Sequence, residues 1–293
     1  MNLKSLPVLA GLAGLFCSLI TQSLQAEDAH RPQNFQRDKL IAWCIVPFDA
    51  KQRGPAERAD MVTELGLKRV AYDWRAEHVP TFEEEILEYQ KHGIEFFAFW
   101  SWHDELAPLI EKYDIHPQIW LMIPNPDEED QLAKVQGAAR RLLPMVQLTA
   151  KLGCQLGLYN HGGWGGEPEN LVAVCKELRE QHQASNVGIV YNFHHGHEHI
   201  HDFKSSLALM QPHLLCINLN GMADADSVNG LENKIVPIGS GKNEVQMIQT
   251  VLDSGYDGPI GILDHRPELD SKESLQLNLD GLDRLFDSKS VGK

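Results

Sequence analysis

The sequence lacks several features that would assign it directly to a class of protein. Its five cysteines form no CxxC pair and no Cys/His spacing of a zinc site. Positive charge is scarce, with 26 Lys and Arg residues against 41 Asp and Glu residues and a formal charge of -15. Because phosphate backbones are bound mainly through Lys and Arg, we expect no nucleic-acid partner.

Long hydrophobic runs are also scarce, and the one near the start predicts an export signal. Lys4 precedes an apolar stretch from Leu6 to Ile20, and a polar segment then leads to Ala26. This order of basic, apolar and small residues is typical of a secretory signal peptide. The stretch is shorter than the roughly 20 residues of a membrane-spanning helix. We therefore expect a signal peptide at residues 1–26 and a periplasmic or secreted protein free of the membrane after cleavage; an uncleaved anchor is the alternative.

The cysteines beyond this segment are predicted to be buried thiols. They are Cys44, Cys154, Cys175 and Cys216. Export permits disulfides. However, Cys44 and Cys216 lie inside apolar, strand-like runs, and Cys175 lies in a helical run. Free buried thiols are therefore favoured over a disulfide, which stays open as the alternative.

Short apolar runs alternate with amphipathic helical segments along the rest of the chain. The runs are continuous, as in strands buried on both faces of a sheet. The predicted strands are Leu40–Val46, Arg69–Tyr72, Glu95–Phe99, Gln118–Ile123, Gln155–Tyr159, Gly188–Tyr191, Leu214–Leu219 and Ile260–Leu263. The predicted helices are Ala56–Leu65, Thr81–Lys91, Glu105–Tyr113, Glu128–Leu152, Pro168–Arg179, Asp202–Met210, Glu244–Ser254 and Lys272–Phe286.

Local signals support these boundaries and the fold that they define. Thr81-Phe-Glu-Glu predicts a capping box, and Gly66, Gly93 and Gly153 are predicted to end helices. Strands that alternate with helices predict a single-domain α/β fold, a (β/α)8 TIM barrel over residues 27–293. An open doubly wound sheet is the alternative, but it would normally carry a Gly-rich loop after its first strand, and Val46-Pro-Phe-Asp has no glycine.

Polar side chains follow most of the predicted strands. In a TIM barrel the chemistry lies at the carboxyl ends of the strands, so we expect these groups to converge on one mouth. Each of these side chains also has a purely structural explanation. A single His can be a hydrogen-bonded structural group, Trp164 can serve only to pack against its neighbours, and Asn residues can cap turns. The run from His194 to His201 can be a solvated loop. The groups are Asp73, Trp74, Arg75, Trp100, His103, Asn160, His161, Trp164, Asn192, His194, His195, Asn218, Asn220, Asp264 and His265.

Two segments near the C-terminus resemble a known family. Pro237-Ile-Gly-Ser-Gly-Lys242 and Gly255-Tyr-Asp-Gly-Pro259 are similar to the passage between strands seven and eight of the xylose isomerase-like TIM-barrel superfamily. Asn160-His161-Gly and Asn192-x-x-His195 resemble its fifth and sixth strand ends. The superfamily includes sugar isomerases, epimerases and endonuclease IV-type enzymes. The resemblance implies a TIM barrel that removes a proton next to a carbonyl of a sugar or keto-sugar.

The chain departs from the superfamily at the positions that usually hold a divalent metal. Many members use two Glu, one Asp and one His on strands five to eight. Here Tyr159, Asn192 and Asn218 stand at three of these positions, and Asp264 lies near the last. Amide oxygens are weak ligands without carboxylates beside them. The cofactor is therefore left open. A rebuilt metal site would use His161, His195, Asp264 and His265.

These residues define a site hypothesis and its alternatives. His161 and His195 are the acid/base candidates, with Asp264 and His265 orienting or assisting. Trp100 and Trp164 would stack on the sugar ring, and the amides of Asn160, Asn192, Asn218 and Asn220 would bind its hydroxyl groups. Isomerisation, epimerisation and elimination stay equally open. The alternatives are a non-catalytic carbohydrate-binding barrel and an endonuclease IV-type phosphodiesterase, which the acidic charge opposes. The oligomeric state is not indicated.

Overall fold

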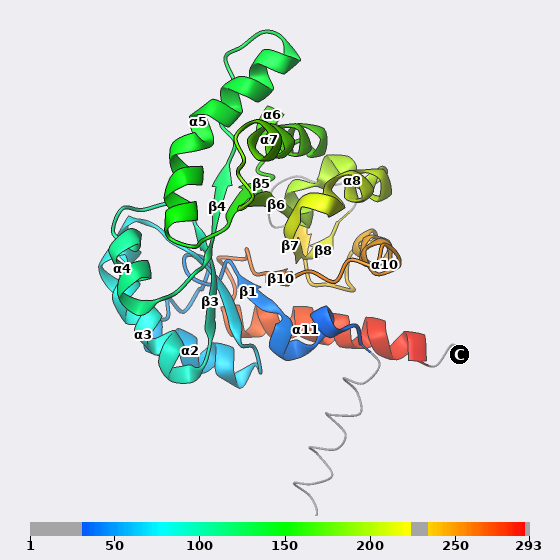
Figure 1. The fold of residues 1–293 in the computed structure, drawn as a ribbon. Coiled ribbons are helices and arrows are strands. Elements are labelled where there is room, and N and C mark those ends of the chain that lie inside the picture. Colours follow the sequence, from blue (N-terminus) through cyan, green and yellow to red (C-terminus); the bar gives the residue numbers. More distant parts are fainter. Residues whose placement is uncertain (1–30, 224–233, 291–293) are drawn as a thin grey trace, which may run out of the picture.

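The computed structural model describes residues 31–223 and 234–290, and their strands close into a barrel (Figure 1). All eight barrel strands are parallel, and the order around the barrel is β1-β10-β7-β6-β5-β4-β3-β2. The predicted single-domain (β/α)8 fold is confirmed. The barrel strands are β1 (Ile41–Trp43), β2 (Arg69–Asp73), β3 (Glu95–Trp100), β4 (Gln118–Met122), β5 (Leu156–Tyr159), β6 (Val187–Asn192), β7 (Leu214–Leu219) and β10 (Ile260–Leu263).

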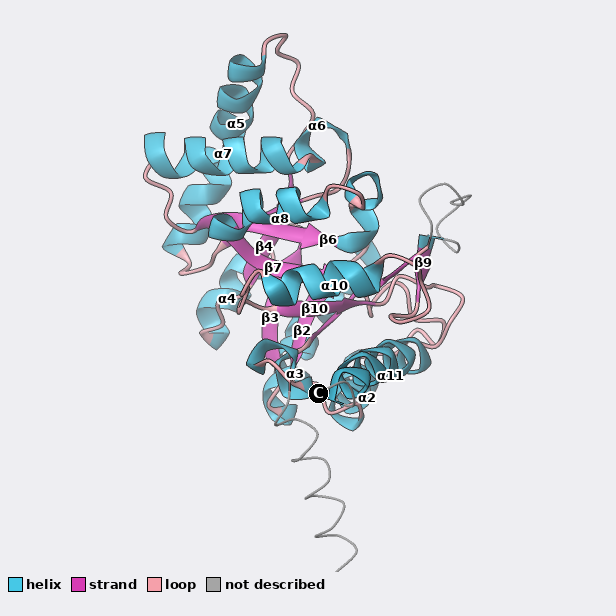
Figure 2. Cartoon of the chain, turned by 90° about the vertical axis from the view of Figure 1, so that its right-hand side faces the viewer, coloured by secondary structure: helices cyan, strands magenta, loops and turns pink. Residues whose placement is uncertain are grey.

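Helices surround the strands (Figure 2). The main helices are α2 (Pro55–Glu64), α3 (Phe82–His92), α4 (Leu106–Tyr113), α5 (Gln131–Lys151), α7 (Pro168–Gln181), α8 (Phe203–Met210), α10 (Glu244–Asp253) and α11 (Ser271–Ser290). Of the helices that the structure describes, none is long and apolar enough to span a bilayer. The predicted signal peptide, residues 1–26, lies outside the described residues.

Aromatic side chains fill the interior of the barrel. Trp43 on β1 contacts Trp120 on β4, with ring centroids 4.9 Å apart, and Tyr159 on β5, at 6.2 Å. These strands lie far apart in the order around the barrel, so the rings meet across its interior. Side chains therefore fill the interior of the barrel, and ligands must bind at its ends.

Several helix and strand ends agree with the sequence patterns and others differ for local reasons. Gly66, Gly93 and Gly153 have φ values of 72°, 65° and 69°, which end the preceding helices as predicted. Strand β1 is shorter than predicted, because Cys44 has a φ of 63° and turns the chain out of the strand. Helix α5 starts at Gln131, later than predicted, with Asp130 as its N-cap.

The predicted capping box at Thr81 is wrong. A six-residue 3-10 segment, Ala76–Thr81, leads directly into α3. The Thr81 hydroxyl donates a hydrogen bond to the backbone oxygen of His78, at 2.9 Å, and does not cap the helix. The four described cysteines are free and buried, as predicted: Cys44, Cys154, Cys175 and Cys216.

A buried carboxylate organises the connection between β7 and α10. Glu244, the first residue of α10, is fully buried. Its carboxylate accepts hydrogen bonds from the backbone nitrogens of Met222, Gly239 and Gly241, at 3.0, 3.0 and 2.8 Å. Met222 belongs to a short antiparallel ribbon, β8 (Gly221–Met222) with β9 (Ile235–Val236), which the sequence analysis did not predict. The Pro237–Lys242 segment thus folds around one carboxylate.

We expect Glu244→Ala to lower the free energy of unfolding by about 2–4 kcal/mol. The substitution removes the acceptor of three backbone N–H groups, of which that of Met222 is buried and those of Gly239 and Gly241 are in part-buried hydrogen bonds. Urea unfolding followed by circular dichroism measures the change. Glu129→Ala, at an exposed position, is the control. A loss no larger than that of the control would contradict the role of Glu244.

Candidate active site

Four histidine side chains form a continuous row at the carboxyl end of the barrel, which we call the imidazole row. His161 follows β5, His194 and His195 follow β6, and His265 lies two residues beyond β10. Ring centroids are 4.2 Å apart for His161 and His195, 3.6 Å for His195 and His194, and 5.5 Å for His194 and His265. The structure thus brings together three predicted site residues, with His194 as the link.

The imidazole row is held in its neutral form. Burial, and then repulsion from neighbouring cationic groups, lowers the pKa of His195 to about 2. The same causes lower the pKa of His265 to about 4 and that of the buried His194 well below its usual value. His161 is exposed, and partial desolvation lowers its pKa as well. At neutral pH each ring therefore offers one N–H donor and one basic nitrogen.

Aromatic rings support this row on one side. Trp100, at the end of β3, is partly buried and stacks near His161, with centroids 5.8 Å apart and planes inclined by 29°. Its ring also lies 4.3 Å from that of Tyr159. Tyr159 in turn lies 5.7 Å from His195. Trp100 therefore packs beside His161 and Tyr159, and its stacking on a sugar ring stays a prediction.

Trp164 lies elsewhere. It belongs to a short helical turn, α6 (Gly163–Gly166), and not to an open glycine loop. Its indole Nε1 donates a hydrogen bond to Oε1 of Gln131 on α5, at 3.1 Å. Its backbone oxygen accepts one from Asn170, at 2.8 Å. The structure therefore ties Trp164 to the outer helices and does not bring it to the imidazole row.

The amides at the ends of β5, β6 and β7 bind one another. Asn160 Oδ1 accepts hydrogen bonds from the backbone nitrogen of Asn192, at 2.7 Å, and from its side-chain amide, at 3.2 Å. The amide of Asn218 donates to Asn192 Oδ1, at 2.9 Å. All three side chains are buried. These amides fasten neighbouring strands together and are not presented at the mouth, where hydroxyl binding would need them.

Asn220 differs from the other three amides. Its nitrogen donates to the backbone oxygen of Gly221, at 2.8 Å. Its Oδ1 is buried and has no hydrogen-bond partner in residues 31–223 and 234–290. Of the four predicted amides, Asn220 therefore keeps an unused acceptor.

Two buried carboxyl groups lie at the same end of the barrel. Asp264 follows β10 and Asp73 ends β2, and each is only 1% exposed. Burial raises the pKa of both to about 7. Burial, and then the charges of Asp73 and Asp264, raise the pKa of the Cys44 thiol, which follows β1 between these two strands. Asp264 was predicted as a site residue. Asp73 follows a predicted strand without an assigned role, because the sequence does not show how deeply it is buried.

The residues present do not fit the divalent metal site that the superfamily implies. The side-chain amides of Asn192 and Asn218 are hydrogen-bonded to other side chains, and Tyr159 lies buried among aromatic rings. Across the described ranges, no three His, Cys, Asp or Glu side chains are grouped to hold a metal ion. In the described residues, the alternative metal site predicted from His161, His195, Asp264 and His265 is therefore not formed. We assign no step of the chemistry to a metal.

Two hollows flank the imidazole row at the mouth, and Gly162 lines both. The first, of about 380 Å³, which we call the apolar hollow, is lined by Ser101, Leu121, Met122, Ile123, Pro124, Asn125, Tyr159, His161, Gly162 and Gly165. The second, of about 340 Å³, which we call the polar hollow, is lined by Gly162, Gly163, Gly166, Glu167, His195, His197, Glu198, His199 and Lys234. His161 borders the first and His195 the second, so the hollows meet at this pair.

The polar hollow contains groups that the sequence analysis did not select. Lys234 is half-buried, and desolvation lowers its pKa. His197 is buried, and its Nδ1 lies 3.2 Å from the backbone oxygen of His194. Nε2 of His199 lies 2.9 Å from Oε2 of Glu167. The run from His194 to His201 is therefore not a uniform solvated loop, although His201 itself is exposed. Lys234 had no sequence signal, because its position depends on the β8–β9 ribbon.

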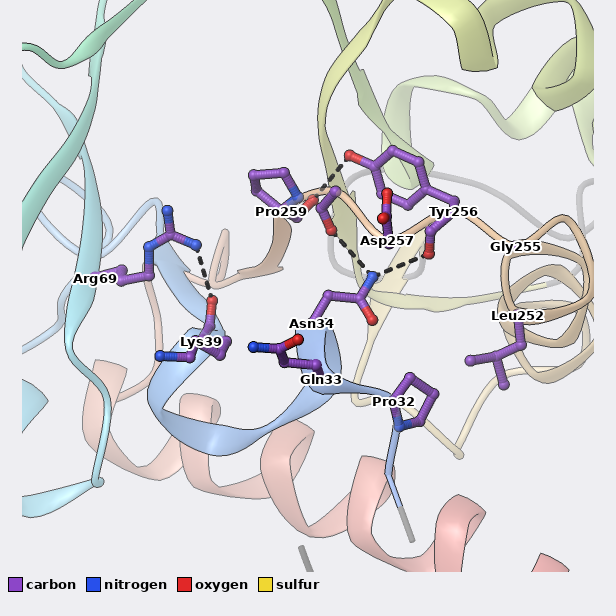
Figure 3. A pocket seen from close by; sticks show the side chains of 11 residues that line it. Pro32, Gln33, Asn34, Lys39, Arg69, Leu252, Gly255, Tyr256, Asp257 and Pro259 are labelled. Carbon is purple, nitrogen blue, oxygen red and sulfur yellow. Dashed lines mark hydrogen bonds between the residues drawn. The ribbon is translucent and has the colours of Figure 1, made fainter. Parts of the chain in front are cut away.

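A further hollow of about 480 Å³ lies at the opposite end of the barrel (Figure 3). It is bordered by residues at the starts of strands, among them Lys39 and Pro259, which precede β1 and β10, and Arg69, which begins β2. The Asn34 amide donates to the backbone oxygens of Tyr256 and Gly258, at 3.1 and 3.0 Å. These bonds join the N-terminal segment to the loop before β10. This end of a TIM barrel serves stability, and we place no chemistry there.

Comparison with known proteins identifies the family. Residues 84–283 match the sequence model of the xylose isomerase-like TIM barrel. The chain therefore belongs to this family, as the resemblance at the strand ends implied. Comparison with curated protein sequences gives no match.

Solved structures share the fold at low sequence identity. The 3-keto-D-glucoside 4-epimerase YcjR from E. coli has a TM-score of 0.59 and 14% identity, over 84% of this chain and 98% of that one. The probable 3-DHS dehydratase AsbF from Bacillus anthracis has a TM-score of 0.65 and 16% identity, over 83% and 98%. The IolI protein with a bound zinc atom has a TM-score of 0.63 and 12% identity, over 85% and 98%. These likenesses establish a shared fold.

Proposed function

We propose that the chain is an exported enzyme that removes a proton from the carbon next to the carbonyl of a sugar or keto-sugar. The observation that carries the proposal is the pair of neutral imidazoles, His161 and His195, 4.2 Å apart where two hollows meet. Family membership supports the reaction class, since solved proteins of this fold include an epimerase and a probable dehydratase. Export is inferred from the signal-like sequence of residues 1–26.

The neutral state of the pair suits proton transfer. A neutral ring can accept the proton at its basic nitrogen, while the N–H of its neighbour donates a hydrogen bond to the developing enediolate oxygen. Burial makes even one proton on the pair unfavourable at rest, and a second charge at 4.2 Å would be repelled further. The proton is therefore returned readily. Its return to the neighbouring carbon gives isomerisation, and its return to the opposite face gives epimerisation. Loss of a leaving group gives elimination.

Three further groups would support this pair without contacting the substrate: His194, His265 and Asp264. His194 links His195 to His265 through ring contacts of 3.6 and 5.5 Å. With a pKa raised to about 7, Asp264 is able to hold or release a proton at neutral pH. We assign these groups to orienting the pair and supporting its protonation state.

A second candidate function is sugar binding without turnover. It is favoured by Asn192 and Asn218, which stand where the family resemblance implies metal ligands and whose amides hydrogen-bond to each other and to Asn160. A fold of this kind can host either role.

Deuterium exchange in heavy water distinguishes the two functions. Methyl 3-keto-β-D-glucopyranoside is incubated with the purified protein and followed by proton NMR, and binding is measured by calorimetry. The enzyme proposal expects loss of the signals of hydrogens next to the carbonyl, faster than in buffer. Binding without exchange, across a panel of keto-sugars, would support the second candidate.

We expect treatment with EDTA followed by buffer exchange to leave the exchange rate unchanged. The reason is the donor set, since neutral amides bonded to each other offer no carboxylate to a divalent ion. The measurement is the exchange rate before and after treatment, with the metal content determined in parallel. A loss of rate that Mg²⁺, Mn²⁺ or Zn²⁺ restores would show that this expectation is wrong.

A further inference from the structure

The apolar hollow has a lining unlike the other strand ends of the barrel. Four consecutive apolar residues at the end of β4, Leu121 to Pro124, line the hollow, and Tyr159 lines it beside them. Met122 is 48% exposed, although most other strand ends carry polar groups. An exposed apolar side chain in a concave site gains free energy when a ligand removes it from water.

The two hollows are joined at the reacting groups and differ in chemistry. The polar hollow carries Lys234, Glu198 and imidazole side chains. Gly162 lines both hollows, and the contact between His161 and His195 connects them. At about 380 and 340 Å³, each lies near the lower end of the size range of small-molecule sites, where a single ring system fits. A ligand that fills both needs a polar part, an apolar part and its reacting carbon between them.

We propose that the substrate is a glycoside whose sugar ring occupies the polar hollow and whose apolar aglycone, such as a phenyl group, occupies the apolar hollow. This inference rests on the proposed function of the same site. A free monosaccharide would leave Met122 and its neighbours in water. A second sugar would need several hydrogen-bonding side chains. Apart from His161, which is assigned to the reacting carbon, and the buried Tyr159, the apolar hollow offers Ser101 and Asn125, whose Oδ1 already accepts from the backbone nitrogen of Trp164, at 3.1 Å.

Calorimetry with two matched glycosides tests the inference. Methyl and phenyl β-D-glucopyranoside differ only in the aglycone, and neither has a carbonyl, so the proposed chemistry cannot consume them. We expect the wild-type protein to bind the phenyl glycoside at least about tenfold more tightly, because its ring is buried against apolar side chains. Equal affinities, or no binding of the phenyl glycoside, would overturn the inference.

A substitution in the apolar hollow assigns the preference to it. We expect Met122→Gln, which keeps the length of the side chain but makes it polar, to lower the phenyl-to-methyl affinity ratio at least about threefold. Leu277→Gln, at a position 46% exposed on α11, is the matched control and should keep the wild-type ratio. A ratio that survives Met122→Gln would refute the placement of the aglycone.

The outcome is separable from that of the proposed function. Deuterium exchange into methyl 3-keto-β-D-glucopyranoside tests the chemistry without an apolar aglycone. Exchange without a preference for the phenyl glycoside would support the proposed enzyme function and refute the aglycone site. A preference for the phenyl glycoside that depends on Met122, with no deuterium exchange, would support a glycoside-binding site and refute the proposed proton removal.

Discussion

Replacing His195 or His161 with alanine is expected to slow deuterium exchange into the keto-sugar by roughly 10²–10⁴-fold. Each ring provides either the basic nitrogen or the N–H donor of a pair whose centroids are 4.2 Å apart. With one ring removed, the site retains a single group for both tasks. The measurement is the exchange rate at saturating methyl 3-keto-β-D-glucopyranoside.

His103→Ala is the matched control for these variants. His103 also follows a barrel strand, but its ring lies against Trp74 and Phe82, at 5.0 and 5.7 Å, and not against the imidazole row. We expect this variant to exchange at the wild-type rate. Rates for His161→Ala and His195→Ala equal to that of the control would refute the assignment of acid/base groups.

Replacing Asp264 with asparagine is expected to change how stability depends on pH. The pKa of Asp264 is raised in the folded protein from 3.8 to about 7 by burial, so the folded state keeps a proton that the unfolded chain has released. The stabilisation of the protonated form is complete below pH 4 and is lost as pH rises through 7. Between pH 5 and pH 8 the wild-type protein should therefore lose roughly 2.5 kcal/mol relative to Asp264→Asn.

Urea unfolding of both proteins at pH 5 and pH 8 measures this difference. Asparagine has nearly the same shape as aspartic acid and no ionisable group, so the comparison isolates the buried charge. Asp257→Asn, at an exposed position, is the matched control. If the difference in unfolding free energy between wild type and Asp264→Asn is the same at both pH values, Asp264 is not the buried titrating group described here.

The barrel could be predicted from the sequence because its strands are buried on both faces. Such strands require continuous apolar runs, and the eight runs correspond to the eight strands. The ends were harder, because they depend on single backbone conformations. The positive φ of Cys44 that ends β1 has no sequence signal, since this region favours glycine.

The site could be predicted only in part. The convergence of His161, His195 and His265 follows from the rule that strand ends of a barrel meet, but the linking position of His194 does not. Asn160, Asn192 and Asn218 read as exposed polar groups in the sequence. In the fold they complement one another, because an amide is both donor and acceptor and their strands are neighbours.

The location of deuterium within the sugar shows whether the protein removes a proton from the carbon next to the carbonyl. Methyl 3-keto-β-D-glucopyranoside is incubated with the wild-type protein in heavy water, and the position of the label is determined by NMR. We expect deuterium at a carbon adjacent to the carbonyl and at no other carbon, with far slower labelling by His195→Ala. Unlabelled sugar after prolonged incubation, with binding established by calorimetry, would contradict it.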